Sequence, residues 1–149
     1  MNCSEIQKES LGFLMHDATR LIRREFERLA ADHGLTSAQW RLLVHLLRNG
    51  PLPQARLAEL LEIEPISVSR MVDRMEDAGW VTRSPDPNDR RIRIVELTEK
   101  AQEILPQARI IADDLYARTL SGFSQSETEA LFSSLRRLIA NLSENDHVR

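Results

Sequence analysis

Residues 65–97 read PISVSRMVDRMEDAGWVTRSPDPNDRRIRIVEL, and this stretch decides the fold. Its first part, 65–78, repeats apolar residues with the 3.6-residue period of an α-helix. The side chains predicted to face the core are Val68, Met71, Val72 and Met75. Gly79 ends the pattern, because glycine readily adopts the backbone conformation that follows a helix. We therefore predict a helix over 65–78 with one buried face.

The sequence after Gly79 changes to the pattern of β-structure. Two short strand-like runs, 80–83 and 92–97, flank a segment that is dense in turn-forming residues. That segment, 84–91, also carries charges that are unsuited to burial. The sequence predicts a β-hairpin whose charged tip stands out from the body as a wing.

A second short helix is predicted immediately upstream, over 53–61, with an apolar face of Leu57, Ala58, Leu60 and Leu61. Residues 62–64 make a tight turn, and Pro65 suits the first turn of the helix that follows. Two short helices separated by three or four residues have the spacing of a helix-turn-helix. The predicted fold class is therefore mainly α with a small β-hairpin wing (α+β), a winged helix-turn-helix.

Further helices flank this region on both sides. One long helix is predicted over 5–33, and a shorter helix begins with the capping-box spacing of residues 36–39. Downstream, Thr98 caps a long helix that runs to about residue 120. A second capping box, at 124–127, opens the last helix.

The composition is that of a soluble globular protein, with 42% apolar and 29% charged residues in 149. No apolar run approaches the roughly 20 residues that span a bilayer. The first residues lack the basic start and apolar stretch of a signal peptide, so we expect a cytoplasmic protein. The single cysteine, Cys3, excludes an internal disulfide framework and a cysteine-cluster metal site.

Motifs of known catalytic sites are absent from the sequence. The four histidines, His16, His33, His45 and His147, are scattered along the chain. No HExxH, glycine-rich phosphate loop or G-x-S-x-G occurs. We therefore expect no enzyme activity, no metal and no cofactor.

The net charge of −3 argues weakly against nucleic acid, so the distribution of charge matters more than the sum. Residues 67–95 hold six arginines and five acidic residues and are roughly neutral. All but two of the 20 basic residues are arginine, which can bond guanine or phosphate through two hydrogen bonds. Binding to DNA therefore depends on where the arginines of the wing project.

The predicted 65–78 helix has a polar side as well as a buried one. Ser67, Arg70 and Arg74 share that side, and such side chains suit a DNA major groove, where arginine bonds two acceptors of guanine. The same stripe, taken alone, also fits a solvated surface.

The hairpin tip strengthens the DNA interpretation. Arg90 and Arg91 can enter a minor groove, and Asp89 is expected to hold an arginine in place. A solvated loop with a local ion pair is the alternative for the tip alone. A polar helix followed directly by a cationic hairpin favours duplex DNA as the partner. The candidate DNA-binding residues are Pro65, Ile66, Ser67, Ser69, Arg70, Arg74, Asp89, Arg90, Arg91 and Arg93.

Many residues between 67 and 98 resemble the signature of the MarR family of winged helix-turn-helix transcription regulators. The matching residues are Ser67, Val68, Arg70, Met75, Glu76, Gly79, Trp80, Val81, Asp89, Arg90, Arg91 and Thr98. The stretch Leu35-Thr36-x-x-x-Trp40 and the closing residues 97–101 look closest to the SlyA branch. Glu62 departs from the pattern, since relatives often carry glycine in this turn. The resemblance covers about 11–142 and implies a DNA-binding regulator, most simply a repressor.

The resemblance also implies an obligate homodimer. Residues 1–34 and 98–149 would form the helical dimerisation region, and 35–97 the DNA-binding lobe. The apolar stripes are longer than a small winged-helix core can cover, and exposed patches of that size usually mark an interface. The candidate interface residues are Leu14, Leu21, Ile111, Leu115, Leu131, Leu135 and Leu138, each of which could instead be core. A symmetric dimer predicts a palindromic operator.

Members of the family often bind small aromatic carboxylates or phenols between the helical body and the winged lobe. The candidate effector-binding residues here are Leu11, Met15, His16, Arg20, Trp40 and Val44. His16 and Arg20, at i and i+4, could pair with a carboxylate. For Trp40, a place in the core is the stronger interpretation.

Two alternatives remain at the level of the sequence. The first is a redox-sensing regulator that uses Cys3, although its neighbours supply no positive charge to lower the thiol pKa. The second is an adaptor whose winged helix binds another protein, which the near-neutral charge of 67–95 leaves open.

Overall fold

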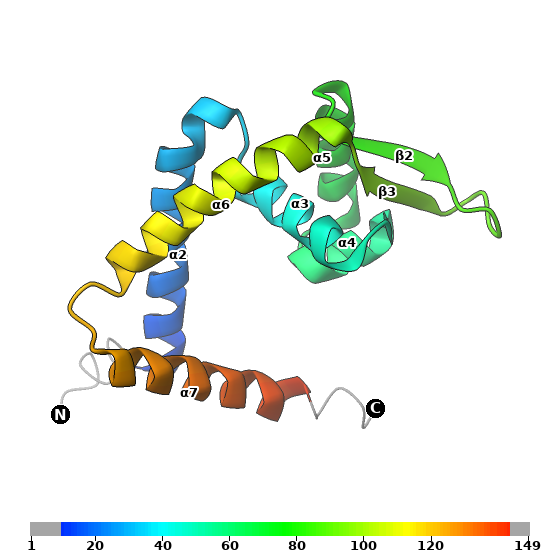
Figure 1. Ribbon diagram of the computed structural model, residues 1–149. Helices are drawn as coiled ribbons and strands as arrows, with labels where there is room; N and C mark the ends of the chain where they lie inside the picture. Colours follow the sequence, from blue (N-terminus) through cyan, green and yellow to red (C-terminus); the bar gives the residue numbers. More distant parts are fainter. Residues whose placement is uncertain (1–9, 144–149) are drawn as a thin grey trace. The chain divides into compact units, whose positions relative to one another are not determined.

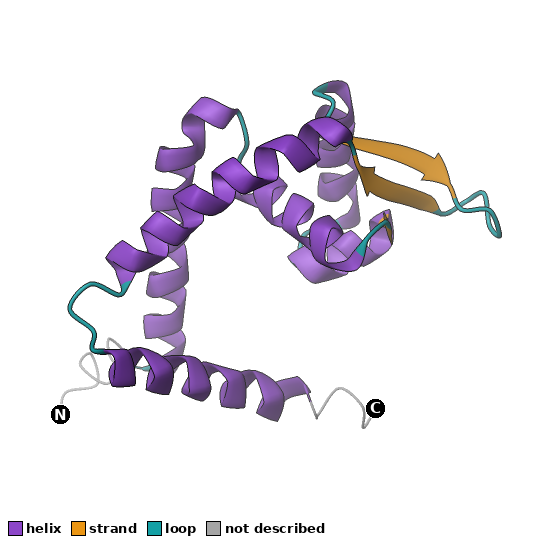
Figure 2. Cartoon of the chain, viewed as in Figure 1, coloured by secondary structure: helices purple, strands orange, loops and turns teal. Residues whose placement is uncertain are grey.

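The computed structural model describes residues 10–143, and its contacts divide the chain into two units, one ending at Leu115 and one starting at Tyr116. The elements are α2 (Leu11–Ala30), the 3₁₀ helix η1 (Ala31–His33), α3 (Ser37–Asn49), β1 (Leu52–Pro53), α4 (Gln54–Leu61), α5 (Pro65–Asp77), β2 (Val81–Pro85), β3 (Arg93–Leu97), α6 (Glu99–Thr119) and α7 (Gln125–Ser143). The predicted fold class is confirmed, because helices predominate beside one small antiparallel sheet (Figures 1 and 2). No helix among the described residues has the length and apolar character to traverse a bilayer. Cys3 and the start of the predicted 5–33 helix lie outside the described residues.

Capping side chains hydrogen-bond the first turns of three helices, and the two predicted capping boxes, before α3 and before α7, are confirmed. The hydroxyl of Ser10 accepts an amide hydrogen bond from the first turn of α2 (3.3 Å). At α3 the capping box is complete, with Thr36 Oγ1 accepting from the N–H of Gln39 (3.2 Å) and Gln39 Oε1 accepting from that of Thr36 (3.1 Å). Before α7, Ser124 and Glu127 make the same reciprocal pair. These bonds satisfy amides that the first turn of a helix leaves free.

The first long helix ends earlier than the sequence predicts. α2 stops at Ala30, and the prediction of one α-helix through residue 33 is wrong for the last three residues. They tighten into the 3₁₀ helix η1, a common ending, because the N–H of Gly34 bonds to the carbonyl of Ala31 (3.2 Å). Gly34 has φ of +71° and closes the segment, as expected of a glycine cap.

Helices α4 and α5 form the predicted helix-turn-helix (Figure 1). Glu62 closes α4 with φ of +52°, in the left-handed region that glycine adopts with least strain. This chain therefore has a glutamate where relatives often carry glycine and where the backbone conformation strains any other residue. Pro65 occupies the first turn of α5. The buried residues of α5 are those predicted, Val68, Met71, Val72 and Met75.

The wing belongs to a three-stranded antiparallel sheet in the order β1-β3-β2. β2 and β3 form the predicted hairpin, with Val81 paired to Leu97. Strand β1, in which Leu52 pairs with Val95, was not predicted from the sequence. A strand of two residues gives no periodic signal, and its Pro53 is tolerated because β1 lies at the edge of the sheet. Since α4 begins directly after β1, this strand joins the helix-turn-helix to the wing.

The core under the helix-turn-helix draws side chains from α3, α4, α5, the hairpin and α6. Its fully buried large residues are Leu42, Leu43, Leu46, Leu57, Val68, Val72, Met75, Val81 and Val95. A second cluster, made of Phe26, Ala30 and Leu115, joins α2 to α6.

The start of α6 is fixed to the end of α5. Thr98 Oγ1 caps α6 by accepting an amide hydrogen bond (3.2 Å), as predicted, and it donates to the carbonyl of Gly79 (2.6 Å). Lys100 Nζ donates to the carbonyl of Ala78 (2.6 Å) and lies 4.3 Å from the centre of a Trp80 ring. The end of α5, the root of the wing and the first turn of α6 are therefore tied together.

Candidate nucleic-acid interface

One face of α5 is exposed and carries polar and cationic side chains. Ser67, Arg70 and Arg74 are exposed on the side away from the core. Within the described part of the chain, neither arginine is in an ion pair. At the start of the helix Pro65 and Ile66 are also exposed, while Ser69 is half-buried. This face presents two unneutralised guanidinium groups and a hydroxyl to an approaching ligand.

The tip of the wing is ordered by carboxylates. Asp89 accepts hydrogen bonds from the backbone N–H, Nε and Nη2 of Arg91, each at 3.1 Å, and so holds an arginine as predicted. These bonds hold the pKa of Asp89 below its usual value. Asp86 Oδ1 accepts from the backbone N–H of Asn88 (2.7 Å) within the same turn. Arg90 is exposed beside this turn and projects from an ordered tip.

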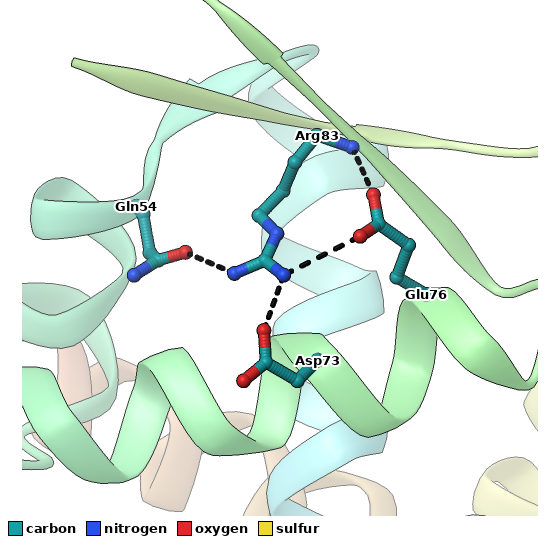
Figure 3. A network of polar contacts seen from close by, with 4 residues as sticks. All are labelled: Gln54, Asp73, Glu76 and Arg83. Atoms are coloured by element: carbon teal, nitrogen blue, oxygen red, sulfur yellow. Dashed lines mark hydrogen bonds and ion pairs between the residues drawn. The ribbon is translucent and has the colours of Figure 1, made fainter. Parts of the chain in front are cut away.

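The root of the wing is pinned to α5 by Arg83, as Figure 3 shows. Its Nη2 donates to Asp73 and to Glu76 Oε1 (3.3 Å), and its Nη1 donates to Gln54 Oε1 (3.4 Å). The backbone N–H of Arg83 donates to Glu76 Oε2 (2.8 Å). One side chain of β2 thus joins the wing to α4 and α5.

The same contacts stabilise the charged form of the Arg83 guanidinium. Burial works against the charge of this guanidinium, but hydrogen bonds and the charges of Asp73 and then Glu76 outweigh burial and raise its pKa. In turn, the guanidinium offsets two carboxylates on the helix that carries Arg70 and Arg74. Arg83 is a functional residue that was not predicted from the sequence. The available signal was alternation in β2, which puts Arg83 on the same face as buried Val81.

The tip end of the wing and the starts of α4 and α5 border one shallow pocket of about 250 Å³. It is lined by Gln54, Ala55, Pro65, Arg91, Ile92 and Arg93. The structure therefore brings Arg91 and Arg93 of the wing together with Pro65 of α5, as one surface for a common ligand requires.

The candidate effector-binding residues do not gather in one cavity. His16 and Arg20 line a shallow pocket of about 390 Å³ along α2, and Arg20 is 3.4 Å from Asp17. Leu11 and Met15 are exposed and do not line this pocket, and Val44 is half-buried. Trp40 packs on Phe26, with ring centres 5.7 Å apart, which agrees with the interpretation as a core residue.

The candidate interface residues divide into exposed and covered sets. Leu14 and Leu21 on α2 and Leu131 on α7 are exposed, while Leu135 and Leu138 are half-buried. For Leu115 the alternative of a core residue holds, because it is 4% exposed within the single chain. Phe26 and Ala30 cover Leu115, and Ile111 packs partly against the same cluster.

A metal centre is not supported by the described residues, which contain no group of three or more histidine, cysteine or carboxylate side chains placed to hold an ion. What the geometry offers instead is an exposed helix of a helix-turn-helix beside an arginine-bearing wing. These features define a winged helix-turn-helix protein of the DNA-binding class.

Comparisons with known proteins agree with this class. The family model described as "MarR family" matches residues 35–92. The chain is 31% identical over 131 residues to the HTH-type transcriptional repressor NicR of Pseudomonas putida, covering 88% of this chain and 83% of NicR. It is 27% identical over 114 residues to the HTH-type transcriptional regulator YybA of Bacillus subtilis, covering 76% of each. The chain belongs to the MarR family.

Solved structures with bound DNA are among the similar folds. A mutant MarR from E. coli in complex with operator DNA has a TM-score of 0.78 at 25% identity, covering 89% of this chain and 96% of that one. The repressor CouR bound to a 23-mer DNA duplex has a TM-score of 0.79 at 27% identity, covering 93% and 99%. The chain is thus a MarR-family transcriptional regulator with a DNA-binding winged helix, and its named relatives are regulators, which are not enzymes.

Proposed function

We propose that this protein is a homodimeric repressor that acts in the bacterial cytoplasm and binds a palindromic operator. In this proposal α5 lies in a major groove and the wing in the adjacent minor groove, twice by symmetry. The observation that carries it is the exposed face of Ser67, Arg70 and Arg74, which Arg83 holds in a fixed relation to the wing. The repressor NicR and the DNA-bound relatives support the same role.

The exposed residues have different roles in this proposal. Ser67 and Arg70, in the first half of α5, read base edges, because the start of a recognition helix points into the groove. Arg90, Arg91 and Arg93 neutralise phosphates and enter the minor groove. The proposed contact surface also includes residues that lie on α5 or at the tip of the wing: Pro65, Ile66, Ser69, Arg74 and Asp89.

Selection of bound sequences from a random DNA pool tests this function, with recovery of an inverted repeat as the expected result. Arg70→Ala should weaken binding to the selected site about 10- to 100-fold and relax the sequence preference at one base position. Arg90→Ala should weaken binding to every duplex, whatever its sequence, and make the dependence of the affinity on salt concentration shallower. With about four phosphate contacts per subunit, the wild-type logarithmic salt slope should be near −7.

Arg109→Ala is the matched control, since Arg109 is an exposed arginine on α6 with an Asp113 partner at 3.7 Å. It should leave the affinity unchanged. If the wild-type protein binds no duplex at low salt, or if all three alanine variants behave alike, the proposed function is wrong.

The dimer is proposed to form through the exposed leucines of α2 and α7, and the division into a dimerisation region and a DNA-binding lobe stays a prediction. Leu21→Glu should shift the protein from dimer to monomer in sedimentation, because a carboxylate would replace a leucine that is 42% exposed in the single chain. Leu47→Glu is the control, since Leu47 is more exposed, at 58%, and lies outside the proposed interface. Equal behaviour of the two variants would contradict the assignment.

The effector is proposed to be a small aromatic acid or phenol held by His16 and Arg20, which line the same pocket. A ligand releases DNA only if it binds one arrangement of the protein more tightly than the other. Salicylate titration, followed by tryptophan fluorescence and by DNA release, tests this step, and flat responses to high millimolar concentration would reject it. Placement within the SlyA branch stays a prediction that rests on Leu35, Thr36 and Trp40 and on residues 97–101.

A further inference from the structure

A third pocket lies between α2, α3 and the turn that follows α4. Its volume is about 410 Å³, within the range of small-molecule sites. It is lined by Arg23, Arg41, Leu60, Leu61, Glu62 and Ile63. Of the expected effector residues, none lines this pocket, although Arg23 also borders the neighbouring pocket of His16 and Arg20. The pocket therefore needs its own explanation.

Arg41 has an unusual environment in this pocket. The side chain is half-buried, and its Nε is sealed from solvent without a hydrogen-bond partner. Within residues 10–143 neither Arg41 nor Arg23 forms an ion pair. Burial lowers the pKa of Arg41, the charge of Arg23 lowers it further, and the charge of Glu62 works in the opposite direction. Two guanidinium groups thus share a pocket without a bonded counter-ion.

This arrangement is unfavourable unless something neutralises it. A partly desolvated charge needs a partner, and two like charges in one pocket raise the cost of leaving it unpaired. Glu62 does not fill the role, because it forms no ion pair with either arginine in the described structure. Guanidinium groups bind carboxylate and phosphate oxygens with strong, charge-assisted hydrogen bonds.

We propose that Arg23 and Arg41 form a binding site for a compact oxyanion, the carboxylate or phosphate group of a small solute. The walls favour such a ligand over a large aromatic one, because Leu61 is only 3% exposed and Leu60 and Ile63 are half-buried. The remaining charged wall is Glu62, which repels anions and so sets a limit on affinity. The turn of Glu62 leads into α5, so an occupied site links α2 to the start of that helix. The consequence of this link for DNA rests on the proposed function.

Calorimetric titration of the full-length protein tests the site without DNA. The probes are sodium phosphate and disodium succinate, each against sodium chloride at the same ionic strength, which separates phosphate from carboxylate as the preferred group. Saturable binding of at least one probe is expected. Arg41→Gln should weaken it about tenfold or more, the weight of a charge-assisted hydrogen bond. Glu62→Gln should strengthen it several-fold, because it removes the repelling carboxylate and keeps the side-chain size.

Controls distinguish this site from its neighbours. Arg109→Gln, which replaces an exposed arginine of α6, should leave anion binding unchanged. Loss of binding in His16→Gln but not in Arg41→Gln would place the anion in the neighbouring pocket and overturn the proposal. Absence of saturable binding, or no strengthening in Glu62→Gln, would overturn it too.

Duplex DNA is the remaining source of phosphate. If Arg41→Gln binds the small anions like wild type but loses DNA affinity with a shallower salt slope, Arg41 contacts the operator backbone, and the small-anion proposal is wrong while the proposed function stands. If wild type binds no DNA but binds the anions through Arg41, the proposed function fails and this inference stands.

Discussion

Two half-buried arginines in the same unit have opposite surroundings. Arg83, at the root of the wing, donates to two carboxylates and an amide oxygen, whereas Arg41, in the α2–α3 pocket, has no hydrogen-bonding or ion-pair partner among the described residues. A guanidinium whose donors are occupied can hold parts of a protein in place. One whose donors are free can bind something that arrives. The partners of an arginine, more than its burial, therefore indicate whether it holds the fold together or is available to bind a ligand.

The largest expected difference between the two arginines is the change in stability when each guanidinium is removed. Arg83→Met should reduce the free energy of unfolding by about 1–2 kcal/mol, a value discounted because Asp73 and Glu76 are partly exposed. Arg41→Met should be neutral or stabilising, since it removes a desolvated charge that has no bonded partner. Urea unfolding of the two variants measures both values. Equal losses of stability in the two variants would contradict the difference between Arg83 and Arg41.

Double-mutant cycles measure how strongly each arginine interacts with a neighbouring carboxylate. The coupling between Arg83→Met and Asp73→Asn should be about 1 kcal/mol, because each residue is the other's hydrogen-bond partner. The coupling between Arg41→Met and Glu62→Gln should be clearly smaller, as no ion pair joins them. A coupling at Arg41 as large as that at Arg83 would show that Glu62 already serves as its counter-ion.

The backbone beside Arg41 gives a smaller effect. Glu62→Gly should stabilise the fold by about 0.5–1 kcal/mol, because glycine relieves the left-handed conformation at φ of +52°. Glu64→Gly is the matched control, since Glu64 has φ of −58° and should only lose stability through chain entropy. Thermal unfolding measures both. A stability gain for Glu62→Gln as large as that for Glu62→Gly would assign the effect to charge instead of backbone strain.

The smallest effect concerns pH. Burial lowers the pKa of His45, and the charges of Arg41 and then Arg48 lower it further. A folded-state pKa below the unfolded value means that the unfolded chain binds more protons. This contribution to stability is therefore present above the unfolded pKa and is lost as the pH falls from the unfolded pKa through the folded one. Arg41→Gln should move the pKa of His45 toward its usual value and weaken this loss, as an NMR titration of the imidazole would show. An unchanged His45 titration would contradict the influence of Arg41, with Arg48→Gln as the comparison variant.

The sequence predicted the fold well where its signals are local. The buried face of α5, the capping box at Thr36 and the glycine cap at Gly34 each follow from residues a few positions apart. β1 was missed because two residues carry no period. The choice between interface and core at Leu115 stayed open because its cover, Phe26, comes from a helix far away in sequence.

The candidate site was predictable only in part for the same reason. The exposed face at Arg70 and the bond between Asp89 and Arg91 follow from spacing along one element. The clamp between Arg83 and Asp73 joins a strand to a helix, and the pocket of Arg23 and Arg41 joins two helices. A single sequence has no short-range pattern that pairs such residues.

The chemical identity of the cations on the α5 face and wing has a consequence for regulation. The exposed ones named above, Arg70, Arg74, Arg90, Arg91 and Arg93, are all arginines. Lys100, near the end of α5, is a lysine whose ammonium is bonded to the carbonyl of Ala78. Enzymatic acetylation neutralises lysine but has no equivalent on a guanidinium. This surface therefore keeps its positive charge when the lysines of a cell are acetylated. Lysine acetylation cannot weaken the electrostatic contacts that these arginines make.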